Sequence, residues 1–140
     1  MQIEIIDPDP AADVHLFNRI SEQVFKEAQQ DVEYINIIFV SRSDLRTLKN
    51  EYFGLDLYTD VITFNLNEEG DAIEGEIYLS FEQITENSKQ FKTDLQDELH
   101  RVLIHGCLHL CGYEDESPIE KNEMTALEDF HLDRIKFELN

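Results

Sequence analysis

The chain has 140 residues, the usual size of one domain, and 41% of them are apolar and spread along its length. Its 31 acidic and 11 basic residues give a net charge of −20, which argues against broad, non-specific binding of nucleic acid through a basic surface. Because neither a long apolar run nor a signal-peptide pattern is present, we expect a cytoplasmic protein that makes no membrane contact.

The first half of the chain predicts two strands and two helices in alternation. Residues 1–7 alternate as a short strand, which the prolines that follow bring to an end. An amphipathic helix is predicted over residues 11–30 and a second strand over residues 34–40. Ser43 is predicted to cap the next helix, which continues to about Tyr52.

The second half predicts a hairpin and then three helices. Residues 59–66 and 76–79 are strand-like, and the polar segment between them indicates a long antiparallel hairpin. The resulting order of elements predicts an α+β fold: a single domain over residues 1–140, with a small mixed sheet of about four strands and about five helices. The order of the strands within the sheet does not follow from one sequence.

Capping residues predict where these three helices start. Ser80 and Thr93 each stand three residues before a glutamine, which is the capping-box spacing. The helix after Thr93 is predicted over residues 94–111 and ends at Gly112. A further capping box, at Ser117 and Glu120, opens a last helix to about residue 137.

The helix over residues 94–111 carries a pattern typical of a metal site. His105 and His109 are four residues apart, so their imidazoles lie one turn apart on one side of the helix. Gly112 permits a left-handed turn that brings Asp115 back toward the same point. Three protein ligands and an open position are typical of a catalytic zinc site, so we predict one divalent ion, by default Zn²⁺, on this core helix.

Other interpretations of the same helix stay open. Two histidines at this spacing also occur as partly buried, hydrogen-bonded residues, although the added turn and carboxylate favour the metal site. Glu98 and Arg101 lie on the histidine stripe, either to orient the histidines or as a solvated ion pair. Cys107 and Cys111 face away from the stripe and are interpreted as small core residues rather than ligands. Three further histidines fall outside the pattern and receive no metal role: His15, His100 and His131.

The segment H-G-C-L-H-L-C-G-Y-E-D resembles the metal motif H-G-x-L-H-L-x-G-Y-D-H of the YbeY family. Upstream, T-D-V-I-T-F and G-E-I-Y-L-S are similar to two strands of that family, so the resemblance covers roughly residues 48–115. It implies a single-strand-specific bacterial endoribonuclease that acts in ribosomal RNA maturation, at the 3′ end of 16S RNA, and in ribosome quality control. The implied partners are single-stranded rRNA, the small ribosomal subunit and ribosomal proteins.

The chain departs from the family pattern at two places. Asp115 stands where the family usually has a third histidine, which zinc accepts but which also resembles the ligand set of non-haem iron enzymes. Phe53 stands where the family has an arginine linked to RNA cleavage. Arg46, on one helix stripe with Arg42 and Lys49, is a candidate for the missing charge, although this stripe is equally typical of a solvated helix face.

The general base is not evident from the sequence. Zinc peptidases carry a glutamate directly after the first histidine, where this chain has Gly106. Three carboxylates are weak candidates for the base: Asp60, Glu114 and Glu116.

Three functions are weighed. The first is a metal-dependent endoribonuclease using metal-activated water, and the second is a ribosome-assembly factor with little nuclease activity, which Phe53 and the acidic surface favour. The third is a metallohydrolase on another substrate, which Gly106 and the resemblance argue against. Because Phe53 and Asp115 both remove positive charge, slow cleavage of free RNA is expected.

Overall fold

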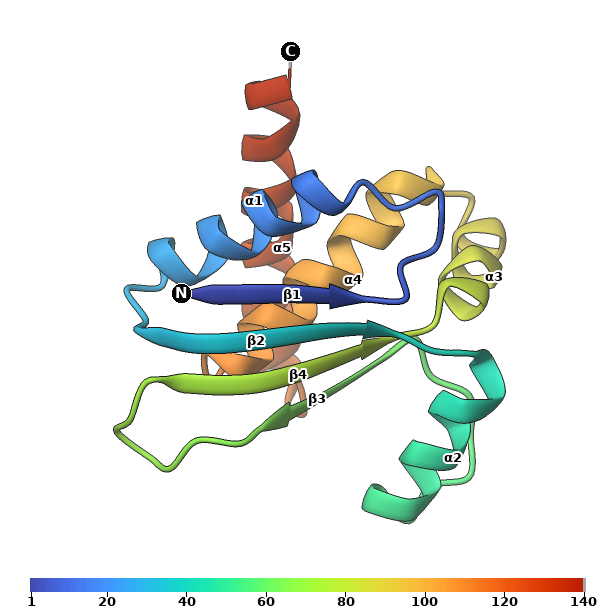
Figure 1. Ribbon diagram of the computed structural model, residues 1–140. Helices are drawn as coiled ribbons and strands as arrows, with labels where there is room; N and C mark the ends of the chain where they lie inside the picture. Colours follow the sequence, from blue (N-terminus) through green and yellow to red (C-terminus); the bar gives the residue numbers. More distant parts are fainter. Residues whose placement is uncertain (140) are drawn as a thin grey trace.

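The alternating segments form one mixed sheet in the computed structural model, which describes residues 1–139. Within those residues the sheet has four strands in the order β1-β2-β4-β3, where β1 and β4 pair parallel to β2, and β3 pairs antiparallel to β4 (Figure 1). The strands are β1 (Gln2–Ile6), β2 (Val32–Phe39), β3 (Val61–Asn65) and β4 (Ile73–Leu79). The hairpin predicted between the last two strands is confirmed, and β3 lies at one edge of the sheet.

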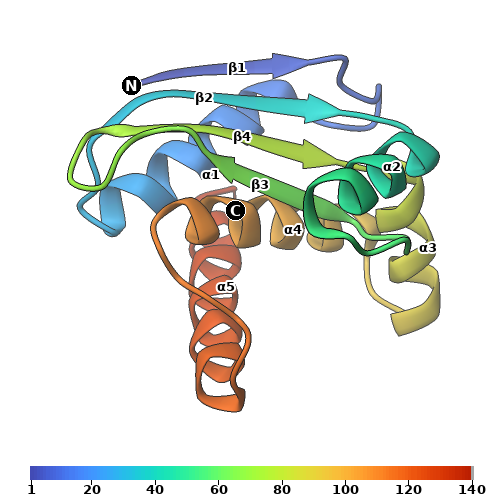
Figure 2. The ribbon, with the colours of Figure 1, turned by 90° about the horizontal axis from the view of Figure 1, so that it is seen from below.

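The helices lie largely on one face of this sheet. They are α1 (Val14–Glu27), α2 (Arg42–Phe53), α3 (Phe81–Phe91), α4 (Leu95–Leu110) and α5 (Pro118–Leu139). Figure 2 shows α1 and α4 against the same face of the sheet, with α5 beyond α4 and running away from it. The predicted α+β fold, with its four strands and five helices, is confirmed for the described residues.

Helix α4 is the central element, because it contacts α1, α3, α5 and the strands of the hairpin. Its fully buried residues include Leu99, Leu103 and Ile104, which pack into the core with Ile37 and Ile77 of the sheet. Gly106 permits a close approach at the middle of the interface. A Cβ atom at this position would meet Cγ2 of Ile77 at 3.0 Å, so a larger residue would push the helix away from the sheet.

Of the four predicted helix caps, two are confirmed and two are wrong. Ser80 Oγ accepts the backbone N–H of Gln83, as predicted, and Ser117 and Glu120 form both bonds of a capping box. Helix α2, however, is capped by Ser41 and not by Ser43, and α4 is capped by Asp94 and not by Thr93. Ser41 and Asp94 are the caps because each side chain accepts the backbone N–H of the residue three positions later. The predicted residues, Ser43 and Thr93, are equally suitable by residue type but do not accept that hydrogen bond.

Among the described residues, no helix combines the length and the apolar character needed to cross a membrane.

Candidate metal centre

Two histidines of α4 point their ring nitrogens at a common position. His105 and His109 are one turn apart, and their Nε2 atoms are 3.0 Å from each other. Both rings are partly buried, because α4 is held against the sheet on its other side. The helix therefore fixes two imidazole nitrogens with a separation suited to a shared ion.

The turn after α4 brings the third side chain to the same place. Gly112 has φ +101°, a left-handed conformation that few other residues adopt, and the chain reverses there. Asp115 Oδ2 lies 3.3 Å from His105 Nε2 and 3.6 Å from His109 Nε2. Hence the three predicted ligands, and no other described histidine, cysteine or acidic residue, form a cluster able to hold a metal ion.

The geometry of this cluster fits a metal ion. Ligand atoms at 2.0–2.1 Å around a tetrahedral ion are about 3.3 Å apart. The separations of 3.0, 3.3 and 3.6 Å bracket that value. Two imidazole nitrogens and one carboxylate oxygen are also a donor set that zinc accepts, and they leave a further position open.

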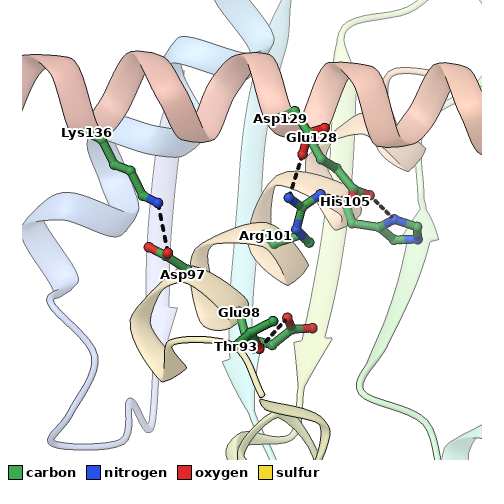
Figure 3. A network of polar contacts seen from close by, with 8 residues as sticks. All are labelled: Thr93, Asp97, Glu98, Arg101, His105, Glu128, Asp129 and Lys136. Carbon is green, nitrogen blue, oxygen red and sulfur yellow. Dashed lines mark hydrogen bonds and ion pairs between the residues drawn. The ribbon is translucent and has the colours of Figure 1, made fainter. Parts of the chain in front are cut away.

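Glu128 of α5 stands directly behind His105. Its Oε2 accepts a hydrogen bond from His105 Nδ1 at 2.6 Å, and the residue is only 7% exposed (Figure 3). With its proton on Nδ1, the ring presents the lone pair of Nε2 to the cluster, which is the tautomer that a metal ligand requires. Nothing local in the sequence distinguishes Glu128 from the other acidic residues of α5, so its role was not predictable from the sequence.

Arg101 holds Glu128 in this position. Its guanidinium bonds Glu128 Oε1 at 2.9 Å and Asp129 Oδ1 at 2.6 Å, and Figure 3 shows it lying between α4 and α5. Of the two residues predicted on the histidine stripe, Arg101 thus acts on His105 through Glu128. Glu98 is instead 3.4 Å from the hydroxyl of Thr93, which donates to it.

The charges around His105 favour a cation. Burial lowers the pKa of His105, but the hydrogen bond and charge of Glu128, together with the charges of Asp115 and Asp60, raise this pKa above its ordinary value overall. Carboxylates that favour a protonated imidazole also favour a divalent ion at the same point.

The cluster opens onto a cleft of about 780 Å³ between α4, β3 and the end of α2. All three carboxylates weighed as bases line this cleft: Asp60, Glu114 and Glu116. Glu114 and Glu116 are exposed, whereas Asp60 is partly buried and accepts a hydrogen bond from the amide of Asn87 at 3.2 Å. Burial raises the pKa of Asp60, and the charge of His105 opposes that shift.

Known proteins share this chain's sequence over most of its length. The family model described as Endoribonuclease YbeY matches residues 3–136. The chain belongs to the YbeY family. A protein of Cytophaga hutchinsonii named Endoribonuclease YbeY is 39% identical over 114 residues, which are 81% of this chain and 80% of that protein. One of the same name from Flavobacterium psychrophilum is 38% identical over 127 residues, which are 91% and 89% of the two chains.

A solved structure supports the same fold. The solution structure of a protein from Thermotoga maritima matches with a TM-score of 0.70 and 31% identity, and the match covers 98% of this chain and 91% of that one.

Phe53, which stands where the YbeY pattern has an arginine, faces the cleft. Phe53, at the end of α2, lines the cleft together with Lys49, and Lys49 Nζ lies 4.8 Å from the Phe53 ring. Arg46, weighed as the substitute cation, is not among the lining residues and forms an ion pair with Asp56 at 2.7 Å. Lys49 is therefore the basic side chain of this helix that borders the candidate metal site.

The two cysteines of this YbeY chain have no part in the cluster. Both are free, and Cys107 is fully buried in the core while Cys111 is partly buried. Burial raises the pKa of both thiols to about 12, so they stay protonated near neutral pH, whereas a metal ligand must be a thiolate.

Proposed function

We propose that the chain is a zinc-dependent endoribonuclease that cleaves single-stranded ribosomal RNA, with the 3′ end of 16S RNA in the small subunit as its target. Its named relatives support the endoribonuclease class, and the YbeY resemblance implies the substrate and the ribosomal proteins nearby. The observation that carries the proposal is the convergence of His105, His109 and Asp115 at the wall of an open cleft. We propose a cytoplasmic location as well, because the proposed substrate is ribosomal.

Each of the three side chains has a defined part. A bound divalent ion would act as a Lewis acid on a phosphoryl oxygen and lower the pKa of water in the cleft. His105 and His109 supply neutral donors, and Asp115 supplies a charged one that makes the site one unit less positive than three histidines would. Two imidazoles and a carboxylate also suit iron, so another divalent metal is the alternative to zinc.

Among the candidate bases, we favour Asp60. It borders the cleft at the start of β3, and Asn87 holds its carboxylate in place. Glu114 and Glu116 are exposed on the loop after α4 and lack such a partner in the described residues. A base must be held in one position to remove a proton from water efficiently.

The zinc-peptidase alternative lacks a structural basis. Its base would stand at position 106, but this position faces the sheet, where even a Cβ would meet Ile77 at 3.0 Å and Thr63 at 3.4 Å. A glutamate there would enter the helix–sheet interface and not the cleft. A ribosome-assembly factor with little intrinsic nuclease activity is also not favoured, because the relatives are named as endoribonucleases.

The first prediction concerns metal content. Purified protein should carry about one divalent ion per chain, and His109→Ala should lose it because only two ligands would remain. Elemental analysis measures the content, and His15→Ala, which changes an exposed histidine outside the cluster, is the control. Wild-type protein without metal, or His109→Ala with undiminished metal, would contradict the site.

The activity assay uses the same samples. Metal-loaded wild type should cleave a single-stranded RNA and spare its duplex, slowly for the free RNA and faster with ribosomal components present. Asp60→Asn should lower the cleavage rate while it keeps the metal. A metal-loaded protein that cleaves no RNA under either condition would leave the metal site intact but refute the proposed activity.

A further inference from the structure

The segment that follows the middle of α2 exposes an unusual amount of apolar surface. Five large side chains between residues 52 and 58 are between 44% and 64% exposed: Tyr52, Phe53, Leu55, Leu57 and Tyr58. Large apolar side chains that are exposed together mark an interaction site more often than single scattered ones do. Its position matters, because Phe53 and Leu55 also line the cleft that contains the metal ligands.

Two of these rings are held in place by a third. Phe53 stacks on Phe64 of β3, with ring centroids 6.1 Å apart and an interplanar angle of 19°. Tyr52 meets the same ring edge-on at a centroid distance of 5.1 Å. Phe64 is itself only partly exposed and contacts Tyr78 of β4, so the sheet fixes the arrangement. We call Tyr52, Phe53 and Phe64 the aromatic platform.

Positive charge lies beside this platform in an otherwise acidic chain. Every cation–π contact within residues 1–139 uses a basic side chain of α2. Lys49 lies over Phe53, and the guanidinium of Arg42 lies 3.8 Å from the centre of the Tyr58 ring. Arg42 also donates to the uncharged amide of Gln83, so its charge is not neutralised by that partner. An aromatic surface flanked by cations is complementary to bases joined by phosphates.

We propose that the aromatic platform binds unpaired bases of the RNA strand next to the cleaved phosphate, and that Lys49, which lies over Phe53 at the wall of the cleft, contacts an adjoining phosphate. This inference rests on the proposed endoribonuclease activity. Bases in a duplex are already stacked on one another, so only an unpaired strand can place a base on Phe53. The platform thus supplies a physical reason for single-strand specificity, and Phe53 replaces the charge of an arginine with a stacking surface.

The absence of tryptophan from the chain allows a direct test. Phe53→Trp keeps an aromatic ring in the platform and introduces a single tryptophan, whose emission can be excited apart from that of the tyrosines. The emission should be quenched when a single-stranded oligouridylate is added, and should change little with an abasic strand of equal length or with an RNA duplex. Phe137→Trp is the matched control, because this phenylalanine is 84% exposed on α5 and belongs to no part of the platform. Its emission should not respond.

Binding measurements complete the test. Phe53→Leu and Tyr52→Leu keep apolar side chains but remove the ring, and each should weaken oligouridylate binding roughly tenfold, with Phe53→Trp close to wild type. Metal content and unfolding midpoints of these variants are measured alongside, to verify that fold and cluster are intact.

Three outcomes are distinguishable. Unquenched Phe53→Trp and unchanged affinity in both leucine variants would overturn the platform, and RNA cleavage by the wild type would then leave the proposed function standing. Equal affinity for the abasic strand would show that phosphates alone are bound and would also overturn it. Quenching by RNA that the metal-loaded wild type does not cleave would uphold the platform and refute the nuclease activity.

Discussion

Glu128 links the packing of two helices to the chemistry of His105. Its buried carboxylate is stabilised by Arg101 on one oxygen and by the His105 ring on the other. A charge of this kind is expensive to bury without such partners. Glu128 is therefore a positioning residue, which holds the ring and its tautomer while it touches neither substrate nor metal.

Replacing Glu128 should weaken metal binding. Glu128→Gln keeps the shape but removes the negative charge behind the ring, and we expect the dissociation constant for Zn²⁺ to rise about 10–100-fold. Competition with a chelating dye measures this constant. Asp129→Asn is the control, because Asp129 bonds the same Arg101 but not the histidine. Equal affinity of both variants and wild type would mean that the negative charge behind His105 does not contribute to metal binding.

The role of a single residue can be predicted from the sequence only when its neighbours along the chain define that role. His105, His109 and Asp115 lie within a helix and the turn after it, so helical spacing alone brings them together. Glu128 reaches His105 only because α5 packs on α4, which no local pattern encodes. Lys49 and Arg46 shared one predicted stripe, and the ion pair of Arg46 with Asp56 distinguishes them only in the folded chain.

The turn that ends α4 is the element that completes the cluster. Gly112, at φ +101°, has open space around its α-carbon, so an added Cβ strains the backbone without a clash. Gly112→Ala should lower the free energy of unfolding by about 1–2 kcal/mol and also weaken metal binding, because Asp115 depends on this turn. Chemical denaturation and zinc titration measure the two effects.

Gly70 provides a matched control for this prediction. It lies in the β3–β4 hairpin at φ +89°, again with open space for a Cβ. Gly70→Ala should cost similar stability and leave metal affinity unchanged. A loss of affinity in both variants would mean that general destabilisation, rather than the placement of Asp115, weakens the site.

The helices and strands were predictable because the spacing of apolar residues along the chain indicates which face of each element is buried. All nine appear in the expected order, but their ends depend on competition between neighbouring residues. Asp94 and Thr93 can both cap α4, and only the folded turn shows which oxygen accepts the N–H of Asp97. Strand order was not predictable, since β4 inserts between β2 and β3 through contacts far apart in sequence.

The net charge of −20 should repel RNA, which is also negatively charged. The distribution of the charges over the molecule explains how this protein could still bind an RNA substrate. Several basic residues are used in ion pairs with acids on neighbouring elements, such as Arg134 with Glu27 and Arg19 with Glu138. Lys49 instead lies over the Phe53 ring, and both residues line the cleft. A strand of RNA would therefore meet a small basic and aromatic area rather than a basic surface, which limits binding to one place.

Two buried histidines outside the cluster should lower the stability of the protein as the pH falls. His100 is 7% exposed, and its Nε2 has no hydrogen-bond partner among the described residues. Burial lowers the pKa of His100, against the opposing charges of Asp97, Asp13 and Asp94. Burial likewise lowers the pKa of His131, whose Nδ1 accepts a hydrogen bond from the Gln23 amide. The fold therefore favours the neutral form of both rings.

The sign of the effect follows from these lowered pKa values. As pH falls through about 6.5, the unfolded chain takes up protons on both histidines while the folded chain resists, so their contribution to stability is lost progressively below that pH. His100→Leu removes one such group, so its stability should fall less than that of wild type between pH 7.5 and 5.5. Urea denaturation of metal-free protein measures the difference without interference from metal release. His15→Leu, at an exposed position, should retain the wild-type dependence. If His100→Leu also kept the wild-type dependence of stability on pH, the protonation of His100 would not be coupled to unfolding.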